Sequence, residues 1–125
     1  MSRSISRESA FRTIYSKLFD SSFEGLEASN DINTKCDINF YNDLCKNFLI
    51  HYDEIKNKIK SSLKGITIDR VYKVDLALIY LAMTELNFFE TPKKVVLNET
   101  VELAKRYSTD KSAKFINGFL AEFLK

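Results

Sequence analysis

The sequence predicts an all-α protein, and three observations support this fold class. The chain has 125 residues, of which 45% are hydrophobic and 13% aromatic, enough to form the core of one domain spanning residues 1–125. It has only 3 glycines and 1 proline, too few for the many tight turns of an all-β protein. Its apolar residues recur at helical spacing over most of its length.

The first helix is expected to span residues 4–19. Five apolar residues follow the spacing of one helical face: Phe11, Ile14, Tyr15, Leu18 and Phe19. The polar stretch at 20–37 follows, with at most a short helix around 23–28.

Residues 38–63 again show helical periodicity, with a boundary expected near 51–53. Asp53 would cap the second piece, and Gly65 suits the stop that follows it. Residues 68–72 can form a short turn or helix. Residues 74–83 are apolar almost all round, which is typical of a helix buried at the centre of a bundle.

The stretch 91–120 predicts two helices with a tight joint. Thr91 would cap the first, with Pro92 at its first helical position, and Thr109 or Asp110 would cap the second. The second helix carries an apolar face of Phe115, Ile116, Phe119, Leu120 and Phe123.

Residues typical of catalytic or metal sites are scarce. The single histidine, His51, excludes a multi-histidine metal site or a His-based triad within one chain, and no phosphate-binding glycine motif occurs. Cys36 and Cys45 do not form a CxxC motif and are expected to be reduced thiols. With no signal peptide or long apolar run, we expect a cytoplasmic protein that is not an enzyme and has no cofactor.

Binding is the remaining class of function. Both ends of the chain are basic and a middle segment is acidic, so ends that meet would form a weak anion-binding patch. The candidate phosphate contacts are Arg3, Arg7, Lys111 and Lys114. The candidates for stacking on unpaired bases are Tyr15, Tyr107 and Phe115. The alternative is that the basic residues are solvated helix faces and that the aromatic residues belong to the core.

Several motifs resemble the NusB family in the same order along nearly the whole chain. They are PKKVVLNETVELAKRY at 92–107, KFINGFL at 114–120, RESA with Tyr15 in the first helix, and the DLALI segment of the central helix. The resemblance implies about seven helices in two packed small bundles. It also implies transcription antitermination: binding of single-stranded boxA RNA as a heterodimer with NusE (ribosomal protein S-ten), within a complex of NusA, NusG and RNA polymerase.

The resemblance also implies a set of site residues, with no metal among its ligands. Arg3, Arg7, Tyr15, Lys114 and Phe115 would face RNA, with the loop around Asp110 and Lys111. Asp75 would fall in the region that faces NusE. Asn98, Glu99 and Asn117 would form joints between helices, with Gly118 allowing a close approach.

Some positions depart from the family pattern. Ser4 and Ile5 stand where basic residues are common, Leu76 and Tyr80 lie near the place of a usual arginine, and Lys111 replaces a frequent acid. We therefore expect weak RNA binding by the chain alone, with NusE supplying much of the affinity. Two alternatives stay open: a structural homodimerisation module, and an RNA-recognition domain like that of some ribosomal RNA cytosine methyltransferases.

Overall fold

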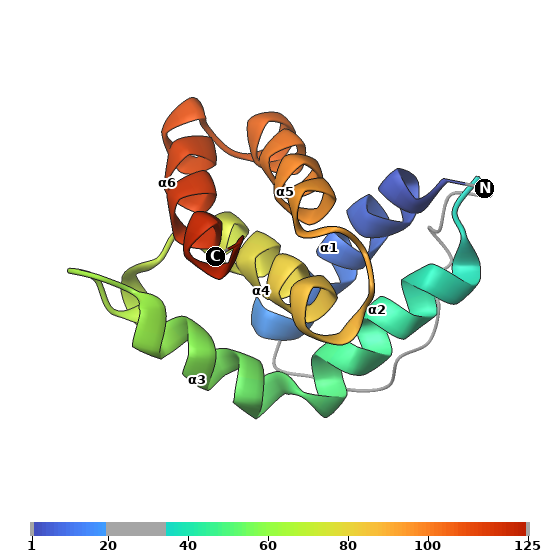
Figure 1. Ribbon diagram of the computed structural model, residues 1–125, viewed down its shortest axis with the longest axis horizontal. Coiled ribbons are helices and arrows are strands. Elements are labelled where there is room, and N and C mark those ends of the chain that lie inside the picture. The colour runs from blue at the N-terminus through green and yellow to red at the C-terminus, as the bar shows by residue number, and fades with distance from the viewer. Residues whose placement is uncertain (1, 20–34, 125) are drawn as a thin grey trace.

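The computed structural model describes residues 2–19 and 35–124, and within these ranges the chain forms six α-helices and two short 3₁₀ turns. The short helix expected around 23–28 lies outside the described residues. The all-α prediction is confirmed (Figure 1).

Helix α1 (Arg3–Phe19) begins one residue earlier than predicted, and its buried face includes Phe11 and Ile14. The predicted break in 38–63 is confirmed, because α2 (Ile38–Ile50) and α3 (Tyr52–Ser62) meet at His51. Asp37 caps α2 by accepting a hydrogen bond from the Phe40 backbone N–H at 3.2 Å.

The prediction that Asp53 caps α3 was wrong. His51 occupies the cap position without a side-chain hydrogen bond, and Asp53 lies in the first turn, where its charge still favours the helix dipole. Gly65 follows the end of α3 with φ of +75°, a conformation that favours glycine.

The helix predicted to be central is α4 (Lys73–Phe88), which follows a 3₁₀ turn (Ile68–Arg70). Every residue of 75–85 is buried. Helix α4 packs against α1 and α2 on one side and against α5 and α6 on the other. Since no face of this stretch meets water, its apolar pattern shows no helical period.

Helices α5 (Lys93–Tyr107) and α6 (Asp110–Ala121) form the predicted pair, and a 3₁₀ turn (Glu122–Leu124) follows. The Thr109 hydroxyl caps α6 by accepting a hydrogen bond from the Ser112 backbone N–H at 3.0 Å. Of the two predicted caps, Thr109 and Asp110, the first is therefore the one used. The cap predicted at Thr91 was wrong, because Pro92 occupies that position and no side chain caps α5.

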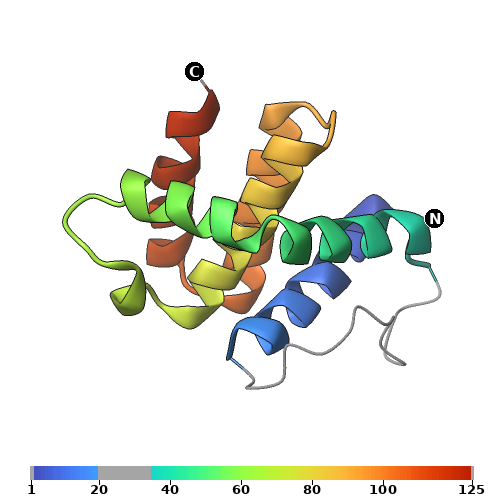
Figure 2. The same ribbon diagram turned by 90° about the horizontal axis from the view of Figure 1, so that it is seen from below.

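The helices form two groups that share α4. Helices α1 and α2 pack together on one side of it, and α5 and α6 pack together on the other (Figure 1). Figure 2 shows α2 and α3 running end to end across one side of the molecule. The two-bundle arrangement implied by the resemblance is confirmed.

Candidate nucleic-acid interface

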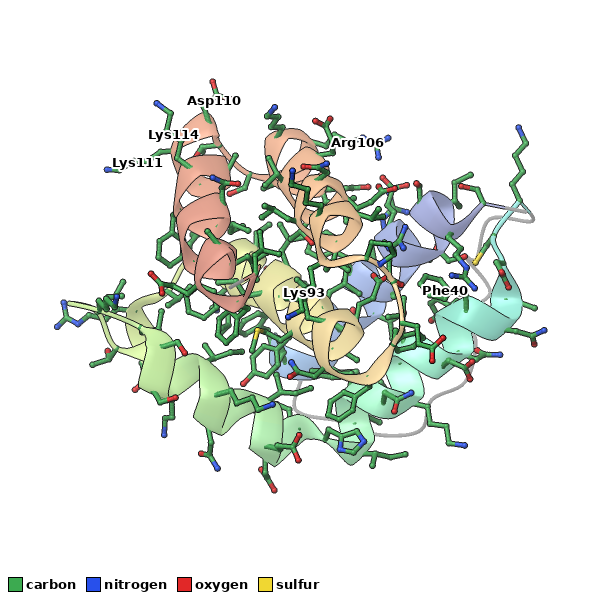
Figure 3. All side chains as sticks on the ribbon, in the orientation of Figure 1. Phe40, Lys93, Arg106, Asp110, Lys111 and Lys114 are labelled. Carbon is green, nitrogen blue, oxygen red and sulfur yellow. The ribbon has the colours of Figure 1, made fainter. Side chains whose placement is uncertain are left out.

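The first candidate residue, Arg3, lies at the start of α1 and is exposed. Its guanidinium lies over the ring of Phe40 from α2, 4.5 Å from the ring centroid, as a cation–π pair. Arg3 is therefore accessible to solvent while its position is held by the ring of Phe40, which Figure 3 labels on α2.

Arg7, one turn further along α1, is buried, with 5% of its surface exposed. Its Nε and Nη2 each donate to the Glu85 carboxylate at 2.7 Å, a bidentate pair with α4. Burial alone would lower the pKa of Arg7, but its hydrogen bond and charge interaction with Glu85, and the charge of Glu99, outweigh burial and raise it.

Glu99 extends this ion pair to α5. Its Oε1 lies 3.4 Å from Arg7 Nη1 and accepts from the Ser4 hydroxyl at 2.6 Å. Its expected role as a joint between helices is thus confirmed. Arg7 joins α1, α4 and α5 inside the protein, so we assign it a supporting role below the surface.

Tyr15 is half-buried in a row of aromatic rings along α1. Its ring centroid lies 6.4 Å from that of Phe11 and 5.1 Å from that of Phe19. The Phe11 ring also contacts Tyr107 of α5, with centroids 5.1 Å apart. This packing leaves Tyr15 half-buried and fixes the orientation of its ring.

The Tyr107 hydroxyl sits between charged residues of α1. It accepts from Arg12 Nη2 at 2.7 Å and donates to Glu8 Oε2 at 2.8 Å. The same Glu8 oxygen accepts from Arg106 Nη1 at 2.6 Å. Sequence reasoning missed Arg12 and Arg106 because no local pattern links residues 95 to 99 positions apart.

Lys111 and Lys114 are exposed at the start of α6. Figure 3 shows both lysines with Asp110 at the first turns of α6, and Arg106 on the side of α5 that faces away from α6. Because Arg106 is paired with Glu8, we call Lys111 and Lys114 alone the cationic edge. Phe115 is half-buried beside it, with its ring centroid 6.5 Å from that of buried Phe119.

The structure thus divides the predicted residues between two places. Lys111, Lys114 and Phe115 lie together on α6, whereas Arg3 lies at the far end of α1, beside the start of α2 (Figure 1). Tyr15 lies towards the other end of α1 from Arg3. Its ring contacts the ring of Phe11, which in turn contacts the ring of Tyr107 on α5.

A groove of about 380 Å³ lies between α5 and α6. It is lined by Val101, Lys105, Asp110, Ala113, Lys114 and Asn117. Lys114 therefore belongs both to this groove and to the cationic edge. Gly118, expected to allow a close approach of helices, does not do so, because a Cβ there would meet nothing within 4 Å.

Asp75, the predicted contact with a protein partner, is buried at 4% exposure in the first turn of α4. Its Oδ1 accepts from the Ser108 hydroxyl at 2.9 Å, at the joint between α5 and α6. The carboxylate is therefore engaged within the fold.

A search of residues 2–19 and 35–124 finds no group of three or more His, Cys, Asp or Glu side chains that could hold a metal ion. In the same ranges, no helix is long and apolar enough to cross a membrane. The two cysteines are buried free thiols, and burial raises the pKa of Cys45 to about 11.

Together these features define a small all-helical binding protein, with a cationic edge, a neighbouring groove and half-buried aromatic rings. The sequence model of the NusB family matches residues 4–125. The chain therefore belongs to the NusB family of transcription antitermination proteins.

Curated relatives agree with this assignment. The transcription antitermination protein NusB of Finegoldia magna is 40% identical over 131 aligned positions, which cover 100% of this chain and 95% of the relative. The transcription antitermination protein NusB of Macrococcus caseolyticus is 35% identical, and the alignment covers 100% of this chain and 98% of the relative.

Solved structures match the fold as well. NusB of T. maritima superposes with a TM-score of 0.86 at 26% identity, covering 99% of this chain and 91% of that chain. A chain from the structure of antitermination factors NusB and NusE in complex with dsRNA gives a TM-score of 0.82 at 26% identity, covering 98% and 95%.

Proposed function

We propose that this protein acts in transcription antitermination by binding boxA RNA of nascent ribosomal transcripts together with NusE. The observation that carries this proposal is the likeness of nearly the whole chain to a protein solved with NusE and RNA. The protein would then join NusA, NusG and RNA polymerase in the cytoplasm and would serve as a binding factor without catalytic activity.

The chemistry of the surface supports RNA as the ligand. Lys111 and Lys114 are exposed and have no ion pair among the described residues, so both charges are open to phosphate oxygens. Phe115 and Tyr15 are half-buried rather than enclosed in the core, and an aromatic ring at the surface can stack on an unpaired base.

The structure also supports a low intrinsic affinity. Arg7, one of the predicted phosphate contacts, is neutralised inside the protein by Glu85. Arg3, Lys111 and Lys114 remain as the exposed cations of that set. Since phosphate neutralisation dominates non-specific affinity, few accessible cations imply weak binding without a partner.

The test is a titration of boxA RNA with the protein, with and without NusE, at two salt concentrations. We expect weak binding by the protein alone and a gain of at least roughly tenfold when NusE is present. Lys111→Ala combined with Lys114→Ala should weaken the complex. Lys46→Ala combined with Lys60→Ala is the matched control, because it removes the same charge from exposed sites on α2 and α3.

Tight, sequence-specific binding of boxA RNA without NusE would contradict the dependence on a partner. An absence of RNA binding at low salt, with and without NusE, would contradict the proposed function itself.

A further inference from the structure

We propose that the groove between α5 and α6 is a pocket for one unpaired guanine of the bound RNA. This inference rests on the proposed function, since Lys114 belongs to both the cationic edge and the groove. It makes Asp110 a contact to a base and adds Asn117 and Lys105 as RNA contacts, and so extends the RNA path from the outer side of α6 into the space between the two helices.

The groove is open to solvent, and its volume is large enough for one base. Its volume of about 380 Å³ lies within the range of ligand pockets, about 300–1,000 Å³. Val101 and Ala113 are half-buried and buried, respectively, and supply apolar surface for the face of a base. The other four lining residues, Lys105, Asp110, Lys114 and Asn117, are polar or charged and come from both helices, so they can bond to the polar edges of a nucleotide.

The polar groups that line the groove are open to a ligand. Asp110 and Lys114 stand one turn apart in the order that favours an ion pair along a helix, yet no ion pair joins them in the described structure. No side-chain hydrogen bond involves Asp110 or Asn117 there either. Lys105 makes one exposed contact, at 3.7 Å to Glu102, which costs little to release.

The donor and acceptor pattern points to guanine. An ionised carboxylate only accepts hydrogen bonds, and its two oxygens match the adjacent N1–H and N2–H donors of the guanine Watson–Crick edge. Lys105 and Lys114 would hold the flanking phosphates, and the Asn117 amide can donate or accept at the ribose or at another base edge.

The Asp110 carboxylate also argues against an acidic protein segment as the occupant. A carboxylate ligand entering between Lys105 and Lys114 would meet the like charge of Asp110, whereas a base would use that charge as an acceptor. Among the occupants that two lysines attract, a nucleotide with hydrogen-bond donors fits this groove best.

The test uses the full chain and three ten-nucleotide RNAs: plain oligouridine, and oligouridine with one central replacement by guanosine or by inosine. Inosine lacks the N2 amino group of guanosine and keeps its N1–H. We expect the wild-type protein to bind the guanosine oligonucleotide roughly tenfold more tightly than the inosine one, the loss expected for one hydrogen bond to a charged acceptor.

Asp110→Asn should abolish this preference without weakening the binding of plain oligouridine, because the substitution removes a negative charge near the RNA. A loss of the preference for guanosine without weaker binding of plain oligouridine distinguishes a contact with the base from a general electrostatic effect. Thr109 still caps α6 in the variant. Glu54→Gln, an exposed carboxylate on α3, is the matched control and should leave the preference unchanged.

Equal affinities of the wild-type protein for the guanosine and inosine oligonucleotides would overturn the pocket and leave the proposed function intact. Failure to bind any of the oligonucleotides at low salt, both with and without NusE, would overturn both. Tighter binding of a hexaglutamate peptide than of the guanosine oligonucleotide would assign the groove to an acidic protein segment instead.

Discussion

Arg7 illustrates how a residue's role depends on partners that the local sequence does not reveal. Arg7 was predicted to contact phosphate, and an arginine in the opening turns of a helix opposes the helix dipole unless an anion lies beside it. The anions are internal: Glu85 and Glu99 lie 78 and 92 positions further along the chain. Removing either member of a buried ion pair leaves a desolvated charge, so the pair as a unit fixes how α1 meets α4.

We expect Arg7→Ala to lower the free energy of unfolding by about 3–5 kcal/mol, because Glu85 would remain buried without its partner. Urea unfolding measures this loss. Arg7→Met combined with Glu85→Leu removes both charges and should regain most of the stability. If the double variant also keeps its affinity for RNA, Arg7 acts through the fold; an RNA-binding defect in a stable double variant would show a direct contact.

The Cys45 thiol gives a dependence of stability on pH. Burial raises its pKa from 9.0 to about 11 in the folded protein. As the pH rises from 9 to 11, the thiol ionises in the unfolded chain before it ionises in the folded one, so the unfolded state is favoured. This contribution to stability is fully present below pH 9 and falls by roughly 1 kcal/mol by pH 10.

The measurement compares urea unfolding of the wild-type protein and Cys45→Ala at pH 8 and pH 10. The two proteins differ only at this side chain, so the comparison isolates the contribution of the thiol. Wild-type stability should fall more steeply with pH than that of the variant, and parallel pH dependences would rule out this linkage.

At the scale of the helix, periodicity predicted the elements well and their ends less well. The sequence predicted the apolar face of α1 and the break between α2 and α3 at His51, because the buried residues of each helix recur every 3.6 residues. The caps at Asp53 and Thr91 failed by one or two residues. Neighbouring polar residues can each cap a helix, and the backbone path chooses among them.

Helix α6 contains a glycine that its packing does not require. Gly118 is exposed in the helix interior, and a Cβ there would meet no atom within 4 Å. We expect Gly118→Ala to raise the free energy of unfolding by about 0.5–1 kcal/mol, because alanine loses less backbone entropy on folding. Thermal unfolding measures the gain, and a lowered melting temperature would show that the position is constrained after all.

At the scale of the whole molecule, the sequence predicted the centre of the fold better than its surface. A helix that is apolar all round must be buried, so the position of α4 followed from its residues alone. The hydrogen bonds of Glu8 and Arg12 with Tyr107 could not be predicted in this way, because polar contacts between α1 and α5 produce no periodic pattern in the sequence. The candidate surface was therefore predicted as a list of residue types, and only the fold could sort those into buried and exposed.

The number of exposed cations sets how steeply RNA binding should depend on salt. Each phosphate contact to single-stranded nucleic acid changes the slope of log K against log salt by about −0.7. With Arg7 neutralised, the phosphate contacts proposed for this protein come from Arg3, Lys105, Lys111 and Lys114. They give an expected slope of roughly −3 for the protein alone. Lys111→Ala should reduce the magnitude of this slope by about 0.7, whereas Lys60→Ala on α3 should leave it unchanged. Titrations over a range of potassium chloride concentrations measure both values.

A slope steeper than about −4 would mean that further cations contact the RNA. Arg12 and Arg106 are the first to test in that case, because both lie beside Tyr107 between the aromatic row of α1 and the cationic edge.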